Sequence, residues 1–271
     1  MMSLTNKPAG SMSLDHAAEL VKQQSLTSDA FLGGRLHVSQ PGNGFRAGLD
    51  SVLLGAAVGA GSCQLLDLGA GTGTAALVAL AHLHALKATL VEADPASAAL
   101  ATRNLAANGF AGRSRVLGLD LTARGAIRAA AGLANDHFST VIANPPFFDA
   151  ASGSPPAIAR AAARHMDAAA LDLWVRTAAA SAAPGGEIVF IHTAVALPAL
   201  LAAFSTRFGG LTVLPLTPRP GAPASRLLVR GIKGSRAPLT LLASRPLHQA
   251  QGRAFQPEFD AIFRGTARLV W

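Results

Sequence analysis

The sequence predicts an α/β fold in which a mostly parallel, seven-stranded sheet carries helices on both faces and ends in an antiparallel hairpin. Three observations lead to this prediction. Short apolar runs typical of buried strands alternate with alanine-rich stretches of helical spacing. The first run of the main domain enters a glycine-rich turn, and the fourth enters a loop with two consecutive prolines. With 271 residues, the chain is long enough to bury a large core.

The chain begins with a segment that we expect to be an extension of a larger domain. Residues 1–60 are predicted to form this extension, a hairpin and a helix that pack on the domain of residues 61–271. The alternation over residues 35–40 indicates a strand, and the proline and glycines after it indicate a turn. Helical spacing begins at Leu49. The first residues carry no motif, so we expect a frayed end.

The first strand of the larger domain, residues 64–68, runs directly into glycines. Gly69, Gly71 and Gly73 follow at a G-x-G-x-G spacing, before an alanine-rich helix that reaches about Leu86. This spacing differs from the G-x-G-x-x-G of the dinucleotide-binding turn. Because glycines between a strand and a helix let a ligand approach backbone amides closely, we predict a ligand-binding turn. A purely structural glycine turn is the alternative.

Carboxylates end the next two predicted strands. Residues 88–91 lead to Glu92, and residues 115–119 lead to Asp120. Ligands of open α/β sheets bind at the carboxyl ends of the strands, where Glu92 is placed to accept both hydroxyls of a ribose. Asp94 is better explained as the N-cap of the helix that follows it.

The fourth strand leads into the loop Asn144-Pro145-Pro146-Phe147. Each proline fixes its own φ and biases the preceding residue towards extended geometry, so neither helix nor strand can continue. Asn144 supplies an amide with donor and acceptor atoms, and Phe147 offers a flat face on which a planar group could stack. The alternative is a Pro-Pro turn that closes a core strand, with Phe147 packed inside.

The remaining sequence continues the alternation of helices and strands. Residues 149–156 have the composition of a mobile loop that could close over a substrate. The other expected elements are helices over residues 122–134 and 167–183, a Pro-Gly-Gly turn over 184–186, a strand over 187–192, a helix that reaches Phe208, and strands over 211–216 and 226–232.

Two motifs resemble those of S-adenosylmethionine-dependent methyltransferases. Asn-Pro-Pro-Phe resembles the Asn/Asp-Pro-Pro-aromatic signature of members that modify planar amino or amide nitrogens. The glycine turn, with Asp67 two residues before it, resembles the first motif of the Rossmann-like methyltransferases. The flanking segments are similar to a bacterial family that methylates the exocyclic N6 amino group of an adenine in the anticodon loop of valine tRNA. The residues that fit its N-terminal signature are Gln40, Pro41, Gly44, Phe45, Arg46, Asp50, Leu53 and Leu54.

The resemblance implies that residues 61–271 form a Rossmann-like methyltransferase domain with S-adenosyl-L-methionine as cofactor and S-adenosyl-L-homocysteine as product. Asp67 would position the positively charged amino-acid end of the cofactor. Asp120 would contact the cofactor's adenine amino group, although a helix cap also explains this residue. The implied cofactor-binding residues are Asp67, Gly69, Ala70, Gly71, Gly73, Glu92, Asp120 and Asn144. The implied catalytic residues are Asn144, Pro145, Pro146 and Phe147.

The same resemblance makes predictions about four charged or basic residues outside these motifs. Arg46 and Asp50 would lie near the cofactor cleft, although Asp50 is also explained as a first-turn helix residue favoured by the helix dipole. Arg164 and His165 match the family's Ala-Arg-His-Glu stretch and are candidates for phosphate or base contacts. A surface or helix-entry position is the alternative for His165. The sequence departs from the family at Met166, where the family carries an acidic residue.

The predicted chemistry needs no strong base. Because the sulfonium of the cofactor makes its methyl group an electrophile, the protein's task is in-line placement of a nitrogen whose lone pair is delocalised into a ring. The amide oxygen of Asn144 and the carbonyl of Pro145 would accept hydrogen bonds from the target amino group, while Phe147 stacks on the base. The base would have to be unpaired or flipped. This mechanism requires Gly71 and Asn144 to share one hollow.

Three other functions compete with adenine methylation. A protein glutamine amide also fits Asn-Pro-Pro-aromatic, but enzymes of that kind usually have tyrosine after the prolines, and this chain contains no tyrosine. A nicotinamide-dependent oxidoreductase is disfavoured by the glycine spacing. A non-catalytic RNA-binding module with the same fold would bind nucleic acid and no cofactor.

Composition limits the partners and the kinds of site. The formal net charge of +8, from 23 Lys and Arg against 15 Asp and Glu, favours a polyanionic partner, and we expect an RNA substrate, above all tRNA. The basic residues are denser from Arg219 to Arg253. A solvated surface whose charge reflects genomic composition is the alternative.

Cys63 is the only cysteine, which excludes an internal disulfide and a cysteine-clustered zinc site, and we expect no metal. No apolar run reads as a membrane span, and the N-terminus lacks the pattern of a secretory signal, so we expect a cytoplasmic protein. The sequence specifies no oligomeric state.

Overall fold

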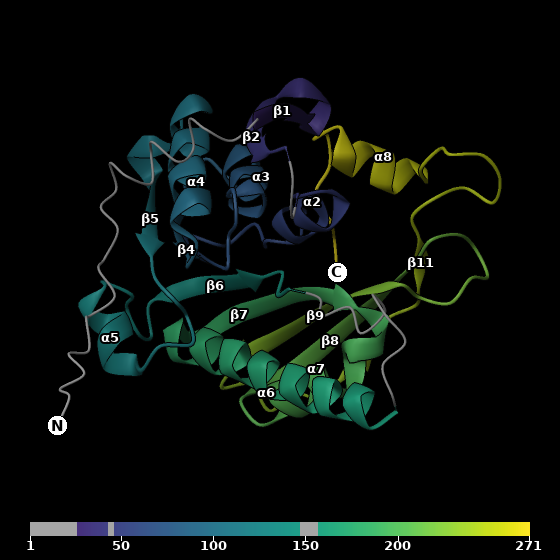
Figure 1. The fold of residues 1–271 in the computed structure, drawn as a ribbon. Helices are drawn as coiled ribbons and strands as arrows, with labels where there is room; N and C mark the ends of the chain where they lie inside the picture. The colour runs from purple at the N-terminus through teal and green to yellow at the C-terminus, as the bar shows by residue number, and fades with distance from the viewer. Residues whose placement is uncertain (1–25, 43–45, 147–156) are drawn as a thin grey trace, which may run out of the picture.

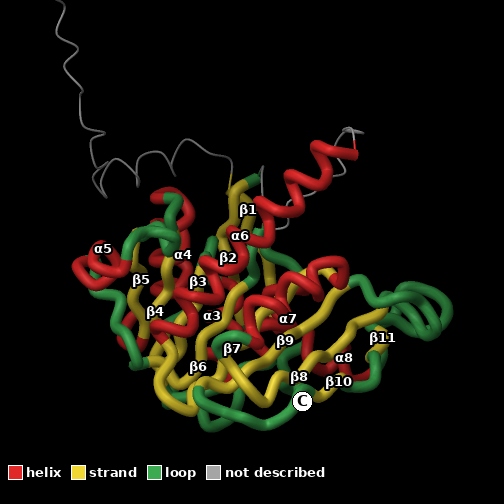
Figure 2. The backbone as a smooth tube through the Cα atoms, turned by 90° about the horizontal axis from the view of Figure 1, so that it is seen from below, coloured by secondary structure: helices red, strands yellow, loops and turns green. Residues whose placement is uncertain are grey.

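The computed structural model describes residues 26–42, 46–146 and 157–271, and of residues 157–168 it describes the backbone alone. In this part of the chain, a central sheet runs in the order β10-β8-β9-β7-β6-β3-β4-β5, and β11 also pairs with β8. Figure 2 shows the strands crossing the molecule from β5 on one side to β10 and β11 on the other. The strands are β3 (Gln64–Leu68), β4 (Lys87–Glu92), β5 (Ser114–Gly118), β6 (Phe138–Ala143), β7 (Ala182–Thr193), β8 (Phe208–Thr217), β9 (Arg226–Lys233), β10 (Thr240–Leu241) and β11 (Arg245–Pro246).

The strand directions confirm the predicted α/β class. β5, β4, β3, β6 and β7 are mutually parallel, and β9 is antiparallel to both β7 and β8, which forms the predicted C-terminal hairpin. All seven predicted strands are present. Two further strands of two residues each, β10 and β11, pair in parallel with β8 and extend the sheet edge. Strands this short carry no detectable alternation, so they could not be predicted from the sequence.

Helices cover both faces of the sheet, because successive strand residues point to opposite sides. Leu65 of β3 belongs to the core under α2, α3, α4 and α8, whereas Leu66 belongs to the core under α6 and α7. Figure 1 shows the first group above the sheet and the second below it. The helices are α2 (Leu49–Ala56), α3 (Thr74–His82), α4 (Pro95–Ala107), α5 (Gly125–Ala130), α6 (Ala157–Ser181), α7 (Leu197–Ser205) and α8 (Pro257–Phe263).

An N-terminal hairpin of β1 (Leu26–Phe31) and β2 (Leu36–Pro41) is held against α4 by side-chain amides. Asn104 accepts from the Ser39 backbone N–H at 2.8 Å and donates to the Ser39 carbonyl at 3.0 Å. Asn108, one helical turn later, makes the equivalent pair of bonds with the backbone of His37. The two side-chain amides therefore form hydrogen bonds with backbone groups of β2 that a third strand would otherwise pair with.

Several predicted boundaries differ from the structure; for example, the helix expected to reach Phe208 ends at Ser205, and Phe208 begins β8. Helix α6 begins at Ala157, ten residues before the predicted start, because its alanine-rich first half has high helix propensity. Helix α5 is shorter than predicted. Strand β7 includes the Pro-Gly-Gly segment, where Gly185 has a φ of 75° and the pairing with β6 shifts register, so this turn is a bulge within a strand. No helix among the described residues has the length and apolarity to cross a membrane.

Candidate functional site

The turn after β3 is shaped by three glycines in the left-handed region. Gly69, Gly71 and Gly73 have φ values of 63°, 56° and 85°. A side chain at Gly69 would also collide with the ring of Trp174 on α6. The turn is closed by the Gly73 N–H, which donates to the Ala70 carbonyl at 2.8 Å. The sequence forms this turn because glycine adopts such angles without a steric penalty.

Asp67 lies beneath the glycine turn and is 2% exposed. Its Oδ2 accepts a hydrogen bond from the Ala76 N–H in the first turn of α3, at 3.2 Å. Burial raises the pKa of Asp67 to about 7, against the lowering effect of the bond from Ala76, and the nearby Glu92 carboxylate raises it further. A cation brought next to this carboxyl group would favour its ionised form.

Glu92 ends β4 and is fixed to the glycine turn. Its Oε2 accepts from the Gly71 N–H at 2.8 Å, and its Oε1 accepts from the Asp94 N–H at 2.9 Å. Each carboxylate oxygen keeps a second lone pair for another donor. Asp94 accepts from the Ser97 N–H at 2.8 Å and is the N-cap of α4, which confirms that prediction.

Asp120 lies just beyond β5, next to the end of β4, because the Leu119 N–H donates to the Glu92 carbonyl at 3.0 Å. The Asp120 side chain is exposed, and its Oδ1 accepts from the backbone N–H and the hydroxyl of Thr122 at 2.8 and 2.7 Å. It does not cap α5, whose N-cap residue is Arg124.

Asn144 follows β6, which pairs with β3, so the loop after β6 meets the glycine turn. The Asn144 side chain is half-buried, and its Oδ1 is fully buried with no hydrogen-bond partner among the described residues. Pro145 is buried and Pro146 is exposed. Phe147 lies outside the described residues, as do Phe148, Gly44, Phe45 and the loop 149–156.

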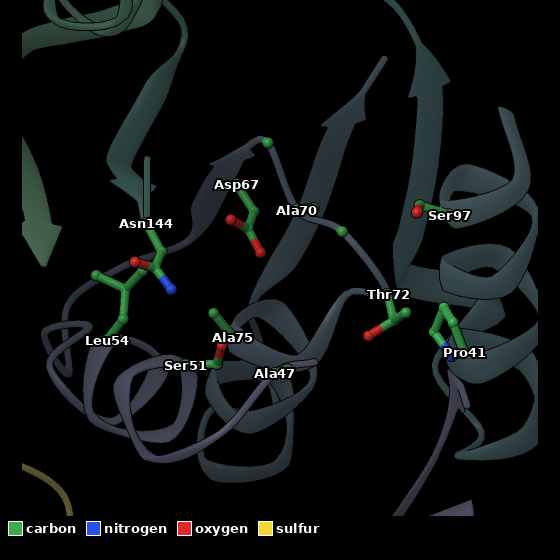
Figure 3. A pocket seen from close by; sticks show the side chains of 12 residues that line it. Pro41, Ala47, Ser51, Leu54, Asp67, Ala70, Thr72, Ala75, Ser97 and Asn144 are labelled. Atoms are coloured by element: carbon green, nitrogen blue, oxygen red, sulfur yellow. The ribbon is translucent and has the colours of Figure 1, made fainter. Parts of the chain in front are cut away.

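The glycine turn and Asn144 border the same cavity of about 160 Å³, as the predicted mechanism requires. Figure 3 shows Asn144 and Asp67 on one side of it, and Thr72, Ser97 and Pro41 on the other. The lining residues are Pro41, Ala47, Ser51, Leu54, Asp67, Gly69, Ala70, Gly71, Thr72, Ala75, Ser97 and Asn144. Gly73, Glu92 and Asp120 do not line it.

Several lining residues were not singled out from the sequence as binding residues. Ser51 and Leu54 lie on α2, and Ala47 lies just before it. The segment before α2 is positioned by Gln40, which is 1% exposed and forms two hydrogen bonds with the backbone of Ala47, at 2.7 and 3.3 Å. In the sequence, the Gln40-Pro41 pair at the end of β2 was the one feature that pointed to this contact.

Arg46 and Asp50 lie beside the cavity but do not line it. Arg46 forms an ion pair with Asp29 at 2.6 Å. Asp50 lies in the first turn of α2 and forms an ion pair with Arg226 of β9 at 2.8 Å. Both charges therefore connect elements around the cavity. The side chains of Arg164 and His165 are outside the described residues, and their backbone lies within α6. Within the described ranges, no group of three or more His, Cys, Asp or Glu side chains could hold a metal ion.

A family model described as the methyltransferase small domain matches residues 50–196, more than half of the chain. The chain belongs to this methyltransferase family. The methyltransferase is 32% identical over 171 residues to the tRNA1(Val) (adenine(37)-N6)-methyltransferase of Porphyromonas gingivalis, covering 61% of this chain and 66% of that protein. A protein of the same name from Pedobacter heparinus is 30% identical, with 60% and 66% covered. The chain thus matches just under two thirds of the length of these relatives, and the resemblance predicted from the sequence is confirmed.

Solved structures support the fold of this methyltransferase. Atu636 of Agrobacterium tumefaciens, described as a predicted O-methyltransferase, is 34% identical with a TM-score of 0.69, covering 81% of this chain and 98% of that one. The 16S rRNA N2 G1207 methyltransferase of T. thermophilus, solved with AdoMet and guanosine, is 22% identical with a TM-score of 0.51, covering 77% and 50%. The second similarity shows a shared fold alone.

Proposed function

We propose that this protein is an S-adenosylmethionine-dependent N-methyltransferase that modifies the exocyclic amino group of an adenine in the anticodon loop of a tRNA. The observation that carries the proposal is the Oδ1 atom of Asn144, which is buried and without a hydrogen-bond partner among the described residues. A buried acceptor without a donor is costly, so it needs an explanation. An amino group of the substrate would supply the missing donor.

Residues that line the cavity and residues beside it fit the proposed cofactor. Asp67 would hold the cationic amino group, and the glycine turn leaves room for the aminoacyl end and the ribose. Glu92, held by the Gly71 and Asp94 N–H groups, would accept the ribose hydroxyls with its remaining lone pairs. Asp120 lies one strand further along the same edge, where it would meet the adenine amino group. When bound, the cofactor supplies an electrophilic methyl group on its sulfonium.

The residues of the Asn-Pro-Pro-Phe loop would orient the target nitrogen. Asn144 Oδ1 and the Pro145 carbonyl would accept the two N–H bonds of the amino group, which directs its lone pair away from them and towards the methyl group. Phe147 would stack on the base. Charge that develops on the nitrogen is stabilised by the same two acceptors, so the proton can leave after transfer.

The N-terminal hairpin and α2 would close one side of the cavity. Pro41, Ala47, Ser51 and Leu54 line that side, and the two bonds between Gln40 and Ala47 hold the connection in place. We therefore infer that residues 26–60 act as an extension of the methyltransferase domain of residues 61–271. The names of the relatives from P. gingivalis and P. heparinus support a tRNA substrate.

The proposal is tested with Asn144→Ala. The variant is expected to retain cofactor binding by calorimetry and to lose nearly all methyl transfer to tRNA. Transfer is measured as N6-methyladenosine by mass spectrometry of digested tRNA. Asn135→Ala, which changes an exposed asparagine before β6, is the control and should alter neither measurement. Unchanged turnover of Asn144→Ala would refute the role given to its amide.

The same assay distinguishes the other methyl acceptors. The Agrobacterium relative is described as a predicted O-methyltransferase, and a protein glutamine amide is the alternative acceptor for the Asn-Pro-Pro-Phe motif. Product methylated on oxygen, or on a glutamine-containing peptide in preference to tRNA, would overturn the adenine assignment while leaving cofactor binding intact.

A further inference from the structure

The whole net charge of the protein comes from one segment of the chain. Residues 188–257 contain eight Lys and Arg and no Asp or Glu, whereas the rest of the chain contains fifteen of each. This acid-free segment runs from β7 through the hairpin of β8 and β9 to the residue that begins α8. Four of the eight form ion pairs with carboxylates outside the segment, so the positive charge that remains to attract a polyanion comes from the other four, Arg253 among them.

Two loops of this segment lie at the same edge of the sheet as the cavity. β8 is parallel to β6, so residues 218–225 leave it at the edge where Asn144 follows β6. β11 is parallel to β8, so residues 247–256 leave at that edge too. In Figure 1 both loops project beyond β11, on the side towards which the arrow of β6 points.

The two loops form one unit, here named the loop pair (residues 218–225 and 247–256). The guanidinium of Arg219 donates to the carbonyls of Gln249 and Gly252 at 2.7 and 2.6 Å. Within the second loop, the rings of His248 and Phe255 stack with centroids 4.6 Å apart. These contacts hold the loops together and leave the side chain of Arg253 exposed, with no ion pair to any described residue.

The strands that lead into Asn144 and into the first loop of the pair end near each other at this edge of the sheet. β6 and β8 are three strand positions apart in the sheet, which corresponds to ~14 Å. A nucleotide backbone that delivers a base to Asn144 spans such a distance within a few residues. The exposed large apolar side chains of the described residues all lie outside the loop pair, so its surface lacks the anchors of a membrane-binding segment.

We propose that the loop pair binds the phosphate backbone of the RNA whose target base enters the Asn144 cavity, with Arg253 as an exposed contact. This inference rests on the proposed function. Arg219 is a positioning residue, because its guanidinium donates to carbonyl oxygens of residues 247–256 and so holds that loop in place. The Gln249 and Gln251 side chains add donors for sugar and phosphate oxygens.

Arg253→Glu tests the proposal against Arg236→Glu. Arg236 is also exposed, belongs to the same acid-free segment and forms no ion pair with a described residue. It follows β9, which runs antiparallel to β6, and therefore lies at the opposite edge of the sheet. The two substitutions change the net charge equally and differ in position.

Arg253→Glu is expected to raise KM for tRNA roughly 3- to 10-fold at low salt and to lower the slope of log affinity against log salt by about 1. The value of kcat and the affinity for S-adenosylhomocysteine should not change. Arg236→Glu should match the wild type. If the reversed charge disturbs the loop, the alanine variants are compared in place of the glutamate variants. Arg253→Ala should then raise KM for tRNA by less than Arg253→Glu does, and Arg236→Ala should leave it unchanged.

The outcomes separate this inference from the function it rests on. If the wild type neither binds nor methylates RNA, the proposed function fails. If the wild type methylates tRNA and the variants at 253 and 236 behave alike, whether both normal or both weakened, the loop pair is not the RNA-binding surface and the proposed function stands.

Discussion

If Asp67 binds the cofactor as proposed, its raised pKa predicts that cofactor affinity depends on pH. Burial raises the pKa of this carboxyl group to about 7, so it is mostly ionised at pH 8 and mostly neutral at pH 6. If the ionised form holds the cationic amino group of the cofactor, the affinity for the cofactor should fall about tenfold when the pH is lowered from 8 to 6. This corresponds to roughly 1.4 kcal/mol of binding free energy.

The assay compares the wild type with Asp67→Asn. Calorimetric titration with S-adenosylhomocysteine at pH 6, 7 and 8 measures both affinities. The amino group of the ligand itself titrates near pH 8, and this contribution is common to both proteins. The ratio of wild-type to variant affinity therefore isolates Asp67 and should increase about tenfold from pH 6 to pH 8. A ratio that stays constant over this range would refute the role of Asp67.

The same substitution should change the dependence of folding stability on pH. Because the pKa of Asp67 in the folded protein lies above its ordinary value of 3.8, its contribution to stability is complete below about pH 4 and is lost as pH rises to about 7. The loss is at most about 4 kcal/mol. Burial lowers the pKa of His192 to about 4, and this group acts in the opposite sense over the same range. The informative quantity is therefore the difference between the unfolding free energies of Asp67→Asn and the wild type, measured in urea between about pH 4 and pH 7.

Two further predictions concern the base and the hairpin. Phe147→Ala should weaken binding of the target RNA by roughly 1–3 kcal/mol with cofactor affinity unchanged, and an unaltered RNA affinity would count against stacking. Asn104→Ala should destabilise the protein by about 2–4 kcal/mol in urea unfolding, because a buried amide with bonds to both backbone groups of Ser39 and to the Thr72 carbonyl is lost. Asn108→Ala, which removes more exposed bonds, should cost less, and equal losses would contradict this reasoning.

The parts of the site that the sequence predicted depend on a general property of parallel sheets. Gly71 and Asn144 are far apart in the chain, but each follows a buried strand, and the carboxyl ends of parallel strands meet at one edge. Two motifs placed after two strands therefore predicted their shared cavity. Asp94 was predicted as a cap because a carboxylate before Pro95 is a purely local signal.

The parts that were missed depend on contacts between distant residues or on weak local signals. The pairing of Asp50 with Arg226 joins residues 176 positions apart, and nothing in either neighbourhood specifies it. The bonds between Gln40 and Ala47 depend on the path of the intervening chain. The sequence predicts the start of α6 too late, because the loop composition of residues 149–156 does not indicate that the helix begins directly after it, at Ala157.

The geometry of the Asn-Pro-Pro segment explains why the amide oxygen of Asn144 is available. A polar side chain in a loop usually accepts from the backbone N–H two residues ahead, as Asp120 does from Thr122 at 2.8 Å. At Asn144 the two following residues are Pro145 and Pro146, and neither has an N–H group. The sequence therefore removes the local donors that would otherwise occupy this oxygen. A buried acceptor without a partner costs roughly 1–3 kcal/mol in the free protein, and the proposed substrate amino group would recover this cost when it binds. In this proposal the prolines would contribute to recognition because they lack N–H groups as well as because they stiffen the loop.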